Sequence, residues 1–184
     1  MKKIFLLFLI SLYSFGICAE KLEDRYVSRL VSEGLLFFIV PYELPAVQKN
    51  KAAEIDITYL IQGDSITLNM SIFTSDIIHA DSIQFASTSV KTITQFETFF
   101  IDKVGKKFVQ RYSCRLPYTY LEEIYRADEP FRMTIYTDEE QLCYGYAAKK
   151  WPKEKTWMRQ IMLIIRRNQQ VQKEQSLHHK QYAS

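Results

Sequence analysis

The sequence predicts an α+β domain: an antiparallel β-sheet or small sandwich built from hairpins, with a short middle helix and a C-terminal amphipathic helix packed on it. Three observations lead to this fold class. Apolar and polar residues alternate in paired runs, which is typical of strands with one buried face. Tight turns join these runs, so neighbouring strands are antiparallel. The last long segment has apolar residues at helical spacing.

Residues 1–19 have the plan of a secretory signal peptide. Lys2 and Lys3 precede an apolar run, and the small residue Ala19 closes it before a charged stretch. The run is shorter than the about 20 apolar residues that a membrane span needs. We therefore expect export of the cleaved chain to the periplasm or the medium of a bacterial cell. A lipid anchor on Cys18 is the alternative.

The cleaved chain is expected to form a single domain over residues 20–167, followed by a polar, disordered tail over residues 168–184. Its length suits one domain with its own core. The hydrophobic content of 47% excludes an intrinsically disordered polymer.

The first predicted element is a helix over residues 22–31, because its apolar residues recur at helical spacing and Gly34 follows. A buried strand over residues 35–40 comes next, since an unbroken apolar run ends before Pro41. Residues 41–52 are expected to form a loop.

Three hairpins follow. The clearest covers residues 54–72, where two alternating runs flank a Gly-Asp turn. A short strand is expected around residues 83–85, and a second hairpin over residues 96–114. The third hairpin pairs residues 131–137 with residues 141–148.

Two more helices complete the fold. Thr119 and Glu122 match a capping box, which predicts a short helix ending before Pro130. The C-terminal helix begins at Trp151, with Pro152 in its first turn. Its expected apolar face comprises Trp157, Met158, Ile161, Met162, Ile164 and Ile165.

Cys114 and Cys143 are the two cysteines that remain after cleavage. An even pair in an oxidising compartment predicts a disulfide between them. It would close a loop of about 30 residues and contribute about 3–4 kcal/mol. A catalytic thiol is the alternative.

Charge divides the chain unevenly. Residues 20–148 carry 13 Lys and Arg against 19 Asp and Glu, and residues 149–184 carry nine against two. We expect the final helix to pack its apolar face on the sheet. The alternative is peripheral contact with an anionic surface or a partner protein. Nucleic acid is excluded by the compartment and the missing motif. The residues that would contact the anionic surface or the partner protein are Lys149, Lys150, Lys153, Arg166 and Arg167.

His79 gives the best catalytic constellation in the sequence. Asp76 and Asp81 flank it, and Ser75 or Ser82 could be a nucleophile. Residues so close in sequence rarely converge on one reacting atom, so we expect a solvated loop. A cavity that united His79 with a carboxylate and a hydroxyl would instead favour the catalytic hypothesis.

We expect no metal and no cofactor. His178 and His179 lack a third ligand, and residues 138–140 lack the alternating spacing of a calcium loop. The isolated glycines cannot cradle a phosphate.

Three aromatic residues are candidates for a ligand surface: Tyr144, Tyr146 and Trp151. The two tyrosines share a strand face opposite Cys143. If the disulfide points into the core, they point outward. Packing in the core is the alternative, and the usual burial of aromatic residues favours it.

The leading functional hypothesis is an exported envelope protein that acts as a binding, adaptor or accessory module for a protein or glycan, without catalysis. This hypothesis rests on two observations: the sequence has a clear pattern of strands and helices, and it has no recognisable set of catalytic acid and base residues. A secreted hydrolase with dispersed residues near His79 is the first alternative. A structural subunit that assembles through edge strands is the second.

Overall fold

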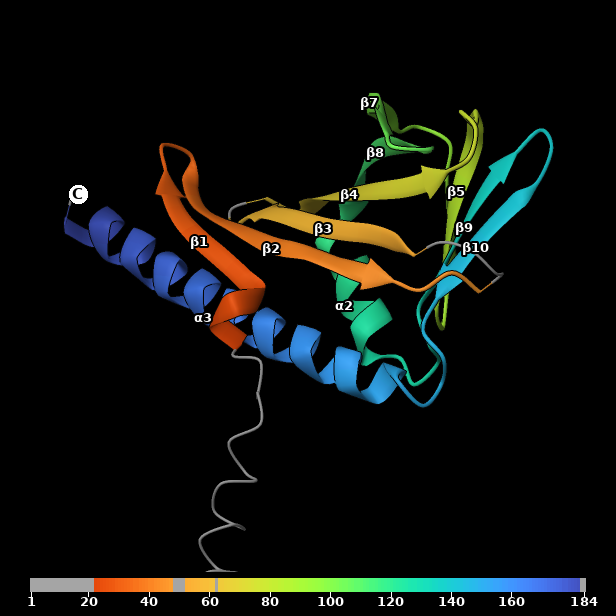
Figure 1. Cartoon of the computed structure of the whole chain (residues 1–184). Helices are drawn as coiled ribbons and strands as arrows, with labels where there is room; N and C mark the ends of the chain where they lie inside the picture. Colours follow the sequence, from red (N-terminus) through yellow and green to blue (C-terminus); the bar gives the residue numbers. More distant parts are fainter. Residues whose placement is uncertain (1–21, 48–51, 62, 183–184) are drawn as a thin grey trace, which may run out of the picture.

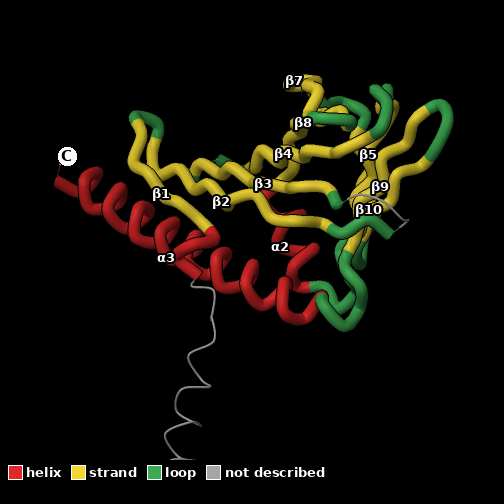
Figure 2. The backbone as a smooth tube through the Cα atoms, in the orientation of Figure 1, coloured by secondary structure: helices red, strands yellow, loops and turns green. Residues whose placement is uncertain are grey.

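The computed structural model describes residues 22–47, 52–61 and 63–182, so the predicted signal peptide lies outside the described residues. The chain folds into two antiparallel sheets and two α-helices, which confirms the α+β prediction (Figures 1 and 2). Within the described residues, no helix is long and apolar enough to cross a membrane.

The larger sheet has the strand order β1-β2-β3-β4-β8-β7, and the smaller sheet has the order β10-β9-β5-β6. The strands of the larger sheet are β1 (Tyr26–Val31), β2 (Gly34–Leu44), β3 (Ala53–Leu60), β4 (Ser65–Thr74), β7 (Glu97–Val104) and β8 (Lys107–Pro117). Those of the smaller sheet are β5 (Ala80–Ala86), β6 (Val90–Ile93), β9 (Arg132–Thr137) and β10 (Gln141–Gly145). The helical elements are η1 (Leu22–Arg25), α2 (Tyr118–Arg126) and α3 (Trp151–Tyr182).

All three predicted hairpins are confirmed, as β3–β4, β7–β8 and β9–β10. In the first of them, Ile57 lies opposite Leu68, and both side chains are buried. Alternation therefore predicted both the strands and the face that they bury.

The predicted helix over residues 22–31 is wrong. This segment forms the single turn η1 and then β1, which pairs antiparallel with β2 at the edge of the larger sheet. Val27 and Leu30, which the helical pattern placed on a buried face, are 57% and 76% exposed. Pairing with the next strand, which follows after a two-residue turn at Ser32 and Glu33, overrides a local spacing that suits a helix.

Strand β2 continues past Pro41, where the prediction ended it. The pairing of β1 with β2 stops at Ile39, and the register between β2 and β3 shifts between Ile39 and Tyr42. Proline is tolerated at such an irregularity because no ladder hydrogen bond is lost there.

The core lies between one face of the larger sheet, the two α-helices and the smaller sheet. In Figure 1, α3 runs along the larger sheet and the smaller sheet stands at one end. Ile55, Met70 and Ile72 from the larger sheet and Phe85 and Ile135 from the smaller one are fully buried in a single cluster. One core thus joins both sheets.

The capping box at Thr119 and Glu122 is also wrong. Helix α2 follows β8 directly, with Pro117 in the cap position and no side-chain cap. Thr119 falls inside the helix, where its hydroxyl cannot act as a cap. Glu122 pairs with Arg166 of α3 and with Arg126.

Helix α3 begins at Trp151 as predicted but continues to Tyr182, through the segment expected to be a tail. Gln169 Nε2 donates to the hydroxyl of Tyr59 at 2.6 Å, so side chains beyond residue 167 still contact the domain.

Strand β7 is an exposed apolar edge of the larger sheet. Phe99 and Phe100 are 64% and 46% exposed. A register shift between Thr98 and Phe100 interrupts the ladder, and Asp102 and Lys103 follow. Bulges and charges on an edge strand disfavour pairing with another chain, so β7 argues against open-ended assembly.

Candidate functional site

The aromatic candidates for a ligand surface are buried. Tyr144, Tyr146 and Trp151 are 3%, 8% and 1% exposed, and all three belong to the core. The outward-facing surface predicted for them is therefore wrong, because the face of β10 that carries the two tyrosines points inward. Tyr144 nevertheless borders the cavity described below. Trp151 stacks on Tyr125 and Tyr146 at ring centroid distances of 5.6 and 5.8 Å.

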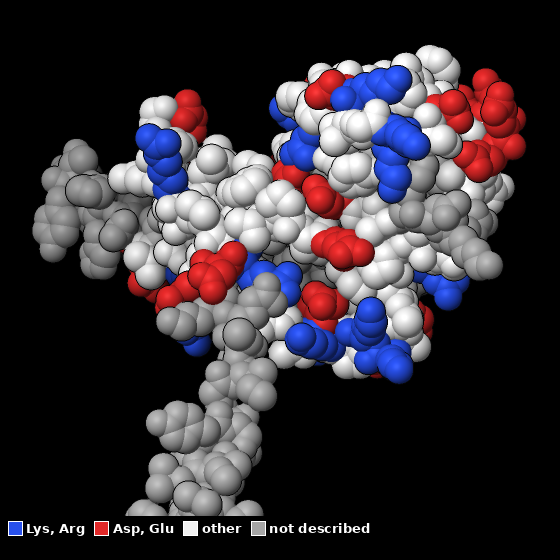
Figure 3. Space-filling model, viewed as in Figure 1, with Lys and Arg blue, Asp and Glu red and all other residues white. Residues whose placement is uncertain are grey.

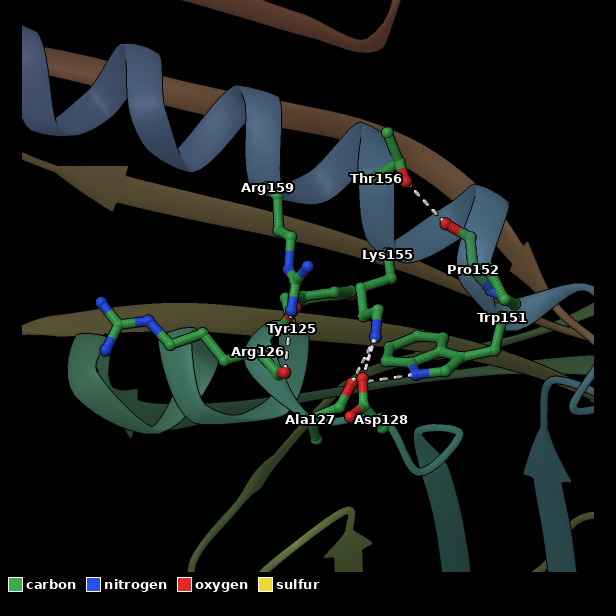
Figure 4. Close-up of polar contacts among 9 residues, drawn as sticks. All are labelled: Tyr125, Arg126, Ala127, Asp128, Trp151, Pro152, Lys155, Thr156 and Arg159. Carbon is green, nitrogen blue, oxygen red and sulfur yellow. Dashed lines mark hydrogen bonds and ion pairs between the residues drawn. The ribbon is translucent and has the colours of Figure 1, made fainter.

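Three side chains from the start of α3 bind the carboxyl end of α2 (Figure 4). Trp151 Nε1 and Lys155 Nζ both donate to the carbonyl oxygen of Ala127, at 3.3 and 3.0 Å. Arg159 donates to the carbonyl oxygens of Tyr125 and Arg126, at 2.7 and 2.8 Å. They satisfy carbonyl groups that the end of a helix leaves unpaired, and the positive charges of Lys155 and Arg159 suit that end of the helix dipole.

The basic residues proposed for partner contact divide into two groups. Arg166 Nε donates to Glu122 Oε1 at 2.6 Å, so this residue joins α3 to α2. Lys149, Lys150, Lys153 and Arg167 are exposed. The apolar face of α3 packs on its own domain, as expected, and contact of the four exposed residues with an anionic surface stays a prediction.

Cys114 and Cys143 are free thiols, so the predicted disulfide is wrong. Cys114 lies in β8 of the larger sheet, whereas Cys143 lies in β10 of the smaller one. Cys143 is opposite Thr134 and makes a hydrogen bond to its hydroxyl at 3.7 Å, on the face away from the buried Tyr144. An even count of cysteines carries no information about the distance between them.

We expect the two thiols to react at very different rates. Burial raises the pKa of Cys114 to about 12, whereas Cys143 is only half-buried. Iodoacetamide at about pH 8 should label Cys143 of the native protein well before Cys114, because the thiolate is the nucleophile. Mass spectrometry after labelling measures this. Denatured, unreduced protein should take up label at both cysteines, and the absence of label would restore the disulfide.

A cavity of about 350 Å³ lies where the two sheets meet. One wall is the loop over residues 75–79, which carries the chain from β4 to β5. The opposite wall is the turn between β9 and β10 with the start of β10. Segments about 60 residues apart in the sequence thus face one another. The lining side chains used below are Ser75, Asp76, Ile77, Ile78, His79, Thr137, Asp138, Glu139, Glu140, Leu142 and Tyr144.

Thr137 shapes the β9–β10 turn. Its Oγ1 accepts hydrogen bonds from the backbone N–H groups of Glu139 and Glu140, at 3.2 and 2.9 Å, and donates to the carbonyl oxygen of Glu140 at 3.0 Å. A threonine hydroxyl that bonds to the backbone in this way stabilises a turn. Three consecutive carboxylates therefore stand on an ordered turn.

Buried polar groups hold the loop over residues 75–79. Gln110 is fully buried on β8; its Oε1 accepts a hydrogen bond from the backbone N–H of Ile78 at 3.2 Å, and its Nε2 donates to Thr74 Oγ1 at 3.0 Å. The hydroxyl of Tyr112 donates to the carbonyl oxygen of Ile78 at 3.3 Å. Sequence reasoning missed these two residues. The available signal was a glutamine on the apolar face of a predicted strand.

The charge of the lining is negative. It includes Asp76, Asp138, Glu139 and Glu140 and contains neither lysine nor arginine. Figure 3 shows acidic side chains gathered at the end of the molecule where the β9–β10 turn lies. Within a cleft, charges of one sign attract ligands of the opposite sign.

Tyr144 lines this cavity with a hydroxyl that has no hydrogen-bond partner among the described residues, although the side chain is 97% buried. Several other buried tyrosines have partners, such as Tyr42 and Tyr125, whose hydroxyls are 2.7 Å apart, but the buried hydroxyl of Tyr118 also has none within the described part of the chain. Burial raises the pKa of Tyr144, and the charge of Glu140 raises it further. The phenol is therefore neutral near pH 7 and able to donate or accept a hydrogen bond.

His79 and Ser75 line the same cavity as four carboxylates, so the structure places these groups together where the sequence suggested a solvated loop. Neither Asp81 nor Ser82 borders it. In the part of the chain that the structure describes, no hydrogen bond joins His79 to Ser75 or to a carboxylate. Nor, among these residues, do three or more histidine, cysteine or acidic side chains converge as metal ligands would.

The chain matches no protein-family model, and comparison with curated proteins and with solved structures finds no significant match.

Proposed function

We propose that this chain is an exported bacterial envelope protein that binds a small molecule in the cavity between the loop over residues 75–79 and the β9–β10 turn, without catalysis. The observation that carries the proposal is Tyr144, whose side chain is 97% buried and borders this cavity, and whose hydroxyl has no hydrogen-bond partner among the described residues. Export rests on the sequence of residues 1–19.

Two features of the cavity support a binding role. Its volume of about 350 Å³ falls within the range of small-molecule sites, roughly 300–1,000 Å³. Its walls are held by hydrogen bonds of Gln110, Tyr112 and Thr137, so the site is largely formed before a ligand arrives. A preformed site loses little conformational entropy on binding.

A two-dimensional amide NMR screen of the purified protein against a fragment library with cationic, neutral and anionic members tests this function. We expect at least one fragment to shift the amides of residues 75–79 and 137–144. The variant Ile77→Trp fills the cavity from the exposed side of the loop and should abolish these shifts. The matched control Val90→Trp adds the same side chain at an exposed position on β6 and should leave them unchanged.

A library without any binder at these amides would contradict the proposal. Shifts that persist in Ile77→Trp would place the ligand elsewhere and contradict it equally.

A hydrolase is the second candidate, favoured by the placement of His79, Ser75 and four carboxylates around one cavity. It stays second because these groups share the cavity without a hydrogen bond between His79 and Ser75 or a carboxylate in the described residues, and a nucleophile must be hydrogen-bonded to its base. One variant separates the two functions. A hydrolase would lose all ester or glycoside cleavage in His79→Ala. A binding module would show no cleavage in either protein and would keep its fragment-induced shifts.

A further inference from the structure

We propose that the ligand of this cavity carries an organic ammonium group. The inference rests on the binding role proposed above and adds the chemical class of the ligand. Carboxylates occupy both walls, with Asp76 on the loop and Asp138, Glu139 and Glu140 on the turn. No cationic side chain of the lining neutralises them, so a ligand must supply the positive charge.

The turn carboxylates are free to pair with a ligand. Among the described residues, Asp138, Glu139 and Glu140 make no ion pair, and the bonds of Thr137 to this turn involve backbone atoms only. Three carboxylates around one cation together correspond to about a tenfold gain in affinity.

Tyr144 gives the site a second recognition element of a different kind. Its side chain is 97% buried and borders the cavity, and its hydroxyl bonds to no other described residue, so the hydroxyl is free to hydrogen-bond to a ligand. Its phenol stays neutral because burial and Glu140 raise its pKa. The phenol oxygen can therefore accept a hydrogen bond from an N–H of the ammonium group.

The cation is organic for two reasons. Metal ions need three or more convergent ligands, and the described part of the chain holds no such group. Besides its acidic groups, the cavity has apolar wall residues in Ile77, Ile78 and Leu142. These side chains can contact the hydrocarbon part of an amine, which a hydrated metal ion lacks.

A charge series of one size tests the class: 2-phenylethylammonium, 2-phenylethanol and phenylacetate. Dissociation constants come from amide shifts of residues 75–79 and 137–144 of the purified protein. We expect the ammonium compound to bind about tenfold more tightly than the alcohol, and the carboxylate most weakly. Raising the ionic strength should weaken the binding of the ammonium compound more than that of the alcohol.

Two charge-matched variants locate the effect. Asp138→Asn/Glu139→Gln/Glu140→Gln should remove the about tenfold preference for the ammonium compound. Glu23→Gln/Asp24→Asn/Glu33→Gln makes the same change in net charge at exposed residues that do not line the cavity, and should retain it. Tyr144→Phe should weaken the ammonium compound with little change in fold stability, since its hydroxyl has no described partner to lose.

The outcomes separate this inference from the binding role. Equal affinities for the ammonium compound and the alcohol, equal losses in the two triple variants, or shifts with Ca²⁺ in place of the ammonium compound would each overturn the ammonium class. The binding role would survive any of these if other fragments still shifted the cavity amides. A protein that binds no compound at the cavity would overturn both.

Discussion

Replacing Arg111 by Met is expected to lower the free energy of unfolding by about 3–5 kcal/mol. Arg111 reaches across the larger sheet and donates to Asp56 Oδ2 at 2.5 Å and to Ser71 Oγ at 2.9 Å. Asn69 donates to the other carboxylate oxygen of Asp56 at 2.7 Å. Asp56 is only 1% exposed, so its charge would remain buried without a cationic partner.

Denaturant unfolding of Arg111→Met and of the control Arg115→Met measures this effect. Arg115 is an exposed arginine on the same strand, and its replacement should change stability by less than about 0.5 kcal/mol. The double variant Asp56→Asn/Arg111→Met should recover part of the loss, because it leaves no buried charge. Similar values for Arg111→Met and Arg115→Met would refute the role of this ion pair.

Replacing Trp151 by Ala is expected to lower the free energy of unfolding by about 3–5 kcal/mol. The indole is 1% exposed, stacks on Tyr125 and Tyr146, and donates from Nε1 to the carbonyl oxygen of Ala127. Its loss leaves a cavity at the point where α3 meets α2. Trp151→Phe retains aromatic packing, loses the donor, and should cost about 1–3 kcal/mol.

Thermal and denaturant unfolding compare these variants with Trp157→Ala, a matched control on the same helix. Trp157 is only half-buried, so its replacement by Ala should lower the free energy of unfolding clearly less than the replacement of Trp151. A Trp151→Ala protein as stable as Trp157→Ala would show that α3 is not anchored through this indole.

The sequence predicted the parts of the fold that depend on local patterns. The alternation around Ile57 and Leu68 identified a hairpin and its buried face, because burial on one side of a strand imposes a period of two. Trp151 correctly marked the start of α3. These features need no knowledge of distant contacts.

The predictions failed where pairing or packing against another segment decides the local structure. The segment around Val27 and Leu30 has helical spacing but becomes an edge strand because β2 is beside it. The sequence could place Tyr144 either in the core or on the surface, and the choice depended on a disulfide at Cys143. That disulfide is absent, and Tyr144 is buried.

The candidate site was only partly predictable. The sequence indicated two separate loops, one with Asp76 and His79 and the other with the carboxylates at residues 138–140. Nothing in the sequence indicated that these loops face one another. Their meeting depends on β5 pairing with β9, where Ala80 lies opposite Thr137. The register that joins residues this far apart is set by packing of the whole sheet.

A crystal structure of the protein grown with its tightest-binding fragment tests the central claim most directly. We expect the compound in the cavity, with a polar atom within hydrogen-bond distance of the Tyr144 hydroxyl and its charged group beside the turn that carries Asp138 and Glu140. A compound bound at another surface, with the cavity empty and the Tyr144 hydroxyl still unpaired, would contradict it.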